Sequence, residues 1–257
     1  MTTWALHSPL DLDACNLRLP AFEGAGLLGM VEQDGATTLY FAERVDEVPI
    51  PGRWEAIADT DWNAAWRASI APVVVGRVAV HPPWLEPPAV EVPLAIEPAQ
   101  AFGTGHHETT AACLTALQEL PLDGRRVLDV GTGTGVLALA ALRLGAASAV
   151  GVDTDPVAVA TASANAVANG LALDVREGST EAVAGDSFDL VVANLDTATV
   201  SALAGDLTRA LARDGVLVVS GVSVERLDTV LGVLTAAGLV TDARPGVEWA
   251  LVLARHE

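Results

Sequence analysis

The sequence contains no lysine. All fourteen of its basic residues are arginines, against thirty-three Asp and Glu, and the formal net charge is −19. The excess of acid runs along the whole chain: residues 1–96 carry 13 acids and 5 arginines, and residues 97–257 carry 20 acids and 9 arginines. Binding to a nucleic-acid backbone needs a basic surface, so direct nucleic-acid binding is disfavoured. An acidic surface instead attracts basic partners, or simply keeps an apolar chain in solution.

Cysteine is nearly absent too. Cys15 and Cys113 stand in unrelated contexts without metal-ligand spacing, which suits a reducing cytoplasm and predicts two small buried side chains. The first residues show no basic region followed by an apolar core, so we expect no secretion signal. The most apolar stretch, 127–152, is interrupted by Asp129, glycines and Arg143, and it is therefore not expected to span a membrane. We expect a cytoplasmic monomer without a bound metal ion.

The residue pattern changes along the chain. Residues 1–60 alternate short β-like runs with turn-rich pieces, which predicts a small α+β domain. Residues 61–96 combine a short predicted helix with proline-rich chain. Six of the fourteen prolines fall in 82–98, a density that predicts a stiff, extended connector. From 97 to 257, strand-like and helix-like segments alternate, which predicts a mainly parallel sheet with helices on both faces. Such sheets bind ligands at the carboxyl ends of their strands.

The strongest chemical signal is the sequence VLDVGTGTG. A predicted strand carrying Asp129 runs through Gly131, Gly133 and Gly135 into a predicted helix. Glycine lets the backbone bend sharply and lets a ligand approach without meeting a Cβ. Dinucleotide-binding dehydrogenases use a similar turn, but they need the third glycine one position later, where this chain has Val136. The spacing therefore favours S-adenosylmethionine over NAD.

Two further predicted strands end in polar side chains. The sequence AVGVDTDP puts Asp153 at the end of the next strand, where a carboxylate can accept hydrogen bonds from both hydroxyls of a ribose. Asp155 is expected to cap the helix that begins at Pro156. The sequence FDLVVANL ends in Asn194, whose side-chain oxygen can accept a hydrogen bond from an amine nucleophile.

The segment AFGTGHHETT, which follows the prolines, makes a poor core segment because it combines two glycines with adjacent Thr and His residues. We expect a loop that covers the site and then a helix. Near the start of that helix, Thr109 or Thr110 can present a hydroxyl or an N–H to the carboxylate of the methionine moiety. Neither His106 nor His107 has an acid or cysteine partner at ligand spacing, so metal binding is disfavoured.

Together, the segments IEPAQAFGTGHHETT, VLDVGTGTGVLALAA, GVDTDPVAV and FDLVVANL resemble the ribosomal protein L-eleven (L11) methyltransferases of bacteria. The likeness runs from about residue 59 to the end, while the first sixty residues match only in size and position. It implies a doubly wound α/β fold with a mainly parallel, seven-stranded Rossmann-like sheet at 97–257. It also implies a ferredoxin-like α+β domain at 1–60 that recognises the substrate.

The resemblance further implies the reaction and the residues that carry it. The enzyme would transfer methyl groups from S-adenosylmethionine to lysine side chains or the N-terminal α-amine of ribosomal protein L11, its basic partner. The cofactor contacts that it implies are Thr110, Gly131, Asp153 and Asn194, with Phe102 and the loop around Thr104, Gly105 and His107 closing over the methyl group. We also predict that Asp129, Gly133, Thr104 and Gly105 belong to the cofactor-binding site. The predicted catalytic residues are Asn194, Phe102 and His107, and we expect His107 to position rather than to act as a base.

Three other functions stay open. The chain could methylate another protein or a small molecule. Glutamine and base-amino methyltransferases usually follow the strand-end Asn with two prolines and an aromatic, whereas this chain reads Asn194-Leu195-Asp196. It could be an NAD-dependent oxidoreductase, which the glycine spacing disfavours, or a cofactor-sensing module without catalysis, which the intact AFGTG loop disfavours.

Overall fold

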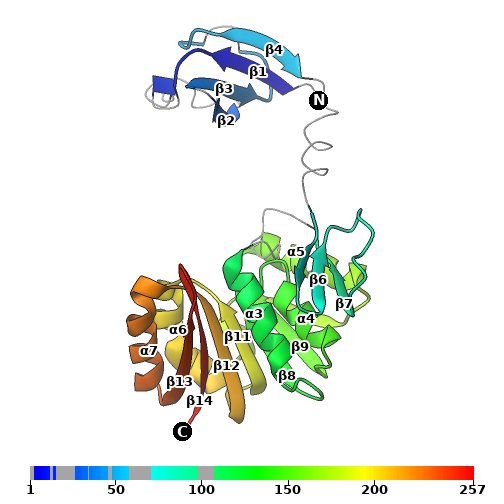
Figure 1. Ribbon diagram of the computed structural model, residues 1–257, viewed down its shortest axis with the longest axis vertical. Helices are drawn as coiled ribbons and strands as arrows, with labels where there is room; N and C mark the ends of the chain where they lie inside the picture. Colours follow the sequence, from blue (N-terminus) through cyan, green and yellow to red (C-terminus); the bar gives the residue numbers. More distant parts are fainter. Residues whose placement is uncertain are drawn as a thin grey trace. The chain divides into compact units, whose positions relative to one another are not determined.

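In the computed structural model of this chain, the described residues are 3–11, 14–15, 27–33, 35–45, 48–57, 71–97 and 107–257. The chain divides into two compact units, Met1–Ile70 and Ala71–Glu257. Both are drawn in Figure 1. Each unit has its own sheet and its own buried apolar core.

The smaller unit holds a four-stranded antiparallel sheet with the order β2-β3-β1-β4. Its strands are β1 (Thr3–Ser8), β2 (Leu27–Gln33), β3 (Ala36–Phe41) and β4 (Arg53–Ile57). They lie close to the β-like runs of the sequence at 3–6, 27–31, 37–41 and 54–58. Leu6, Leu39 and Phe41 form its core with Cys15 and Ile50. The strand order fits the ferredoxin-like sheet that the resemblance implies. The helices of that fold stay a prediction, and residues 42–45 and 48–52 form none.

The larger unit is built on a seven-stranded sheet with the order β10-β9-β8-β11-β12-β14-β13. Its strands are β8 (Arg126–Val130), β9 (Ser148–Asp153), β10 (Leu173–Glu177), β11 (Phe188–Asn194), β12 (Leu211–Ser223), β13 (Leu239–Pro245) and β14 (Trp249–His256). The pairs from β10 to β12 are parallel, and β14 pairs antiparallel with both β12 and β13. The predicted doubly wound, mainly parallel sheet is confirmed. The strand order reverses at β8, and ligands bind such sheets where the order reverses.

Helices cover both faces of this sheet. They are α3 (Glu108–Glu119), α4 (Val136–Arg143), α5 (Pro156–Ala168), α6 (Thr197–Ala210) and α7 (Leu227–Ala236), with the short 3₁₀ helices η2 (Thr180–Val183) and η3 (Val224–Arg226). Because strand side chains alternate, Val127 packs in one core with α3 and α4, and Leu128 packs in the other with α6 and α7. Figure 1 shows these helix pairs on opposite sides of the sheet. Among the described helices, none has the length and apolarity that crossing a membrane requires.

The proline-rich segment differs from the expected extended connector. The strands β5 (Val73–Val75), β6 (Val78–His81) and β7 (Val92–Ala95) form a three-stranded sheet within the larger unit. Val92, Leu94 and Ile96 are buried in the same core as α3 and α4. The alternation of these three residues supplies a strand face to bury, and Pro93 stands between them on the other face. Burial of that apolar face therefore makes this segment part of the core of the larger unit, although its proline count predicted an extended connector.

Candidate functional site

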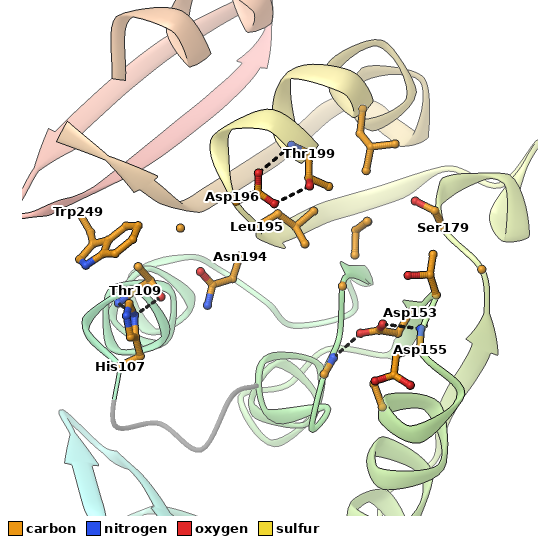
Figure 2. Close-up of a pocket in the computed structure, with 18 residues that line it drawn as sticks. His107, Thr109, Asp153, Asp155, Ser179, Asn194, Leu195, Asp196, Thr199 and Trp249 are labelled. Carbon is orange, nitrogen blue, oxygen red and sulfur yellow. Dashed lines mark hydrogen bonds between the residues drawn. The ribbon is translucent and has the colours of Figure 1, made fainter. Parts of the chain in front are cut away.

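A pocket of about 560 Å³ opens at the carboxyl ends of the parallel strands (Figure 2). Its volume lies within the roughly 300–1,000 Å³ typical of small-molecule sites. The predicted site residues that line it are His107, Gly131, Gly133, Asp153 and Asn194. They come from four separate segments of the chain, so the fold brings together what the sequence predicted separately. The predicted residues Phe102, Thr104 and Gly105 lie outside the described residues.

The glycine-rich turn forms the floor of the pocket. Gly131, Gly133 and Gly135 have φ values of 70°, 56° and 82°, in the left-handed region that favours glycine. The Gly131 N–H donates to the carbonyl oxygen of Val152 on β9 at 2.9 Å. A Cβ on Gly131 would lie 2.4 Å from Cδ2 of Leu195, closer than real contacts allow. The turn therefore needs glycine for its conformation, while an added Cβ at Gly131 would require the end of the Leu195 side chain to move.

Asp129 lies behind this turn and is 1% exposed. Its Oδ2 accepts hydrogen bonds from Oγ1 of Thr132 at 2.8 Å and from the N–H of Ala138 at 3.3 Å. Burial raises the pKa of Asp129 to about 6, the two hydrogen bonds oppose this rise, and the charge of Asp153 adds to it. Its carboxylate thus links the turn to the first helical turns of α4.

Asp153 ends β9 and faces the pocket, as Figure 2 shows. Its Oδ2 accepts from the Gly133 N–H at 2.9 Å, and its Oδ1 accepts from the Asp155 N–H at 3.0 Å. A carboxylate can accept about four hydrogen bonds, so two further donors can be accommodated. The prediction for Asp155 is confirmed: it is the N-cap of α5 and accepts from the Val157 N–H at 2.8 Å.

Asn194 ends β11 and faces the first turn of α3. Its Nδ2 donates to Oγ1 of Thr110 at 3.3 Å, and Thr110 itself is fully buried. The Asn194 Oδ1 is buried and has no hydrogen-bond partner within the described part of the chain. A buried acceptor without a partner costs roughly 1–3 kcal/mol. This oxygen is therefore suited to receive a hydrogen bond from a ligand in the pocket.

His107 and Trp249 form the wall next to Asn194 (Figure 2). His107 is the N-cap of α3, and its Nδ1 lies 2.8 Å from Oγ1 of Thr109. The rings of His107 and Trp249 meet edge to face with centroids 5.3 Å apart. Trp249 was not among the predicted site residues. Because β14 runs antiparallel to β12, its first residue lies at the edge where the parallel strands end.

Other lining residues, which were not predicted, follow β11 or lie near the end of β12. Asp196 is the N-cap of α6, accepting from the N–H groups of Ala198 and Thr199 at 2.9 and 3.1 Å. Hydrogen bonds from Thr199, chiefly from its hydroxyl, lower the pKa of Asp196. Leu195 and Gly221 complete this side of the pocket. The signal for Asp196 was an aspartate directly before a helix-like segment, since aspartate is a preferred N-cap residue.

The pocket is acidic. Asp153, Asp155 and Asp196 line it, and no arginine stands among its described lining residues. The described chain also holds no group of three His, Cys, Asp or Glu side chains arranged to bind a metal ion. A ligand that carries positive charge therefore suits this pocket better than one that carries several negative charges.

The chain is similar to known proteins in both sequence and fold. The profile of the family described as ribosomal protein L11 methyltransferase (PrmA) matches residues 32–257. The ribosomal protein L11 methyltransferase of Deinococcus radiodurans is 40% identical over 267 residues, covering 97% of each chain. That of Thermus thermophilus is 40% identical, covering 97% of this chain and 98% of the relative. The crystal structure of a ribosomal protein L11 methylase from Lactobacillus delbrueckii subsp. bulgaricus has a TM-score of 0.68 at 27% identity, covering 73% of this chain and 100% of the other. The chain therefore belongs to the ribosomal protein L11 methyltransferase family.

Proposed function

We propose that this chain transfers methyl groups from S-adenosylmethionine to amino groups of ribosomal protein L11, on lysine side chains or the N-terminal α-amine. Family membership over nearly the whole chain supports the reaction and the substrate. The charge of the pocket is the observation that favours this cofactor, because three carboxylates and no arginine line its described part. A sulfonium is positive and the pyrophosphate of NAD is negative, so this lining favours S-adenosylmethionine.

The pocket residues fit this cofactor. We assign the ribose hydroxyls to Asp153, whose carboxylate has acceptor positions left after its two backbone hydrogen bonds. We assign the methionine carboxylate to the N-terminus of α3, where backbone N–H groups favour an anion. Thr109 lines the pocket there, and the buried Thr110 accepts a hydrogen bond from the pocket residue Asn194. Gly131 and Gly133 leave room for a ligand against the turn.

The reaction needs a neutral amine, although a free lysine, with a pKa of ~10.4, is charged at neutral pH. When bound, S-adenosylmethionine supplies an electrophilic methyl group on a positive sulfur, whose charge also lowers the pKa of a neighbouring amine. In our proposal Oδ1 of Asn194 accepts an N–H of the amine and turns its lone pair toward the methyl group. Trp249 and Leu195 add apolar wall that excludes water. Such alignment can correspond to effective molarities of about 10⁵ M or more.

We assign recognition of the substrate to the smaller unit, as the resemblance implies. The net charge of −19 attracts a basic ribosomal protein. Exposed charges are screened beyond about 8 Å at physiological ionic strength, so association should slow as salt rises. We retain the predictions that the protein acts in the cytoplasm, as a monomer, and without direct nucleic-acid binding.

Incubation of the enzyme with labelled S-adenosylmethionine and free ribosomal protein L11 is expected to place label on lysines or the α-amine of that protein. Mass spectrometry of both proteins locates the label. Since the enzyme has no lysine, label that it retains can lie only on its N-terminal amine or on another kind of side chain. Transfer to a small molecule with none to L11 would contradict the substrate and leave the cofactor assignment intact.

Replacing Asp153 by alanine is expected to weaken binding of S-adenosylmethionine by about 1–3 kcal/mol, the range for losing charge-assisted hydrogen bonds to two hydroxyls. Isothermal titration calorimetry measures the affinity. Asp155→Ala is the matched control because it removes the same charge from the pocket lining but leaves Asp153 in place. Equal losses for the two variants would mean that pocket charge, and not contact with the ribose, determines affinity.

A further inference from the structure

Two buried asparagines at the C-terminal end of α5 hold the backbone of other segments. Asn165 lies in the last turn of the helix and Asn169 caps its C-terminus. Their side chains are 2% and 9% exposed. Neither lines the pocket. Buried side-chain amides are almost always hydrogen-bonded, so the groups that they bond show which segments they connect.

Asn165 connects the glycine-rich turn to the chain that leaves β7. Its Nδ2 donates to the carbonyl oxygen of Thr134 at 2.9 Å, and its Oδ1 accepts from the N–H of Glu97 at 3.0 Å. Thr134 stands between two glycines of the turn, and Glu97 is the second residue after β7. One side chain thus joins two segments that are 37 positions apart in the sequence.

The turn is held from both sides. On the pocket side the Gly133 N–H donates to Asp153, and on the helix side the Thr134 carbonyl accepts from Asn165. One turn earlier on α5, Ala162 packs so closely that a Cβ on Gly135 would lie 3.1 Å from its Cβ. Glycines can adopt many backbone conformations, so a turn that contains three of them needs such external contacts to keep a single one.

We propose that Asn165 is a positioning residue of the cofactor site, acting through the glycine-rich turn. The proposal rests on the proposed function, because the ligand that reports on the turn is S-adenosylmethionine. Gly131 and Gly133 line the pocket, and Asn165 binds the carbonyl oxygen of Thr134, the residue that follows Gly133. Releasing that carbonyl lets the turn depart from the geometry that receives the cofactor, and displacements of about 1 Å suffice to impair a site.

Asn169 provides an internal comparison. Its Oδ1 accepts from the Ala95 N–H at 2.9 Å, and its Nδ2 donates to the carbonyl oxygens of Ala95 and Asn165 at 2.7 and 2.8 Å. It therefore holds β7 and the end of α5 and makes no hydrogen bond to the turn. Loss of either amide removes buried hydrogen bonds and should lower stability, but only loss of Asn165 releases the turn.

The test compares Asn165→Ala with Asn169→Ala in the full-length protein. Calorimetric Kd values for S-adenosylmethionine are measured well below the melting temperature of both variants. We expect about tenfold weaker binding for Asn165→Ala, the effect of roughly one net hydrogen bond, and a change within about twofold for Asn169→Ala. The KM for S-adenosylmethionine should rise in the same proportion, with the KM for the protein substrate unchanged. Equal Kd values for the two variants would overturn the proposal.

Asn165→Asp is the second variant, used also if the alanine variant does not fold. It keeps an acceptor for the Glu97 N–H but removes the donor to the Thr134 carbonyl, so it should also weaken binding. Wild-type affinity in this variant would overturn the role of the turn. A wild-type protein that binds no S-adenosylmethionine would instead overturn the proposed function and this inference with it. Binding by the wild type and by both Asn165 variants alike overturns the inference alone.

Discussion

Replacing Asn194 by alanine is expected to lower methyl transfer to ribosomal protein L11 by about 100-fold or more, because a misplaced reacting group can cost that factor. The Asn194 Oδ1 is the buried acceptor without a partner in the described pocket, and we propose that it orients the amine. Affinity for S-adenosylmethionine should fall much less. Single-turnover rates and calorimetric Kd values separate the two effects.

Thr110→Val is the control for this substitution. It keeps the shape of the side chain but removes the hydroxyl that accepts from Nδ2 of Asn194. The amide then keeps its oxygen but loses one of the contacts that hold its orientation, so we expect a smaller loss of transfer than for Asn194→Ala. If Asn194→Ala instead lowers cofactor affinity as much as it lowers the rate, Asn194 is a cofactor contact and does not orient the amine.

The substitution Gly221→Ala is expected to lower the free energy of unfolding by about 2–4 kcal/mol, from left-handed strain and overpacking together. Gly221 has a φ of 82°, and a Cβ there would lie 2.5 Å from the carbonyl oxygen of Leu195 and 2.8 Å from its carbonyl carbon. Backbone atoms cannot rotate away as the end of a side chain can. Since Leu195 directly follows Asn194, the folded fraction should also lose methyl transfer. Urea unfolding gives the stability, and transfer is measured below the unfolding transition.

Gly238→Ala separates the two causes. Gly238 also has a positive φ, 90°, but no atom lies within 4 Å of a Cβ built there. This variant should show only the backbone strain, roughly 1 kcal/mol, with normal methyl transfer. If the two substitutions cost the same free energy, the close approach of Gly221 to Leu195 contributes nothing to stability.

The sequence pattern indicated strands at 126–130, 149–153, 190–194, 215–220 and 247–253, but it did not indicate the two edge strands of the main sheet. β10 and β13 end the strand order on either side, and their sequences, LDVRE and LVTDARP, are rich in charge. Edge strands carry charged residues and proline because one side has no neighbouring strand. The central strands β8, β9 and β11 are buried on both faces and read as continuous apolar runs, which made them predictable.

The sequence by itself determined the local parts of the site. The GTGTG turn follows an apolar strand, Asp153 and Asn194 each end one, and parallel strands bring their carboxyl ends to one edge. The cap at Asp155 was predictable for the same reason, since a side chain and the N–H that it accepts from lie two residues apart. In each case the chemistry depends on neighbours within a few positions.

Only the tertiary structure decided the remaining parts. Trp249 reaches the pocket because β14 pairs antiparallel with β12, from which it is separated in the sequence by α7 and β13. Gly221 is required by the backbone of Leu195, and Asn165 by a carbonyl 31 positions away. The proline-rich segment joins the core through contacts with α3 and α4 that its composition does not reveal. The roles of these positions depend on contacts with groups far away in the sequence, and those contacts form only when the chain folds.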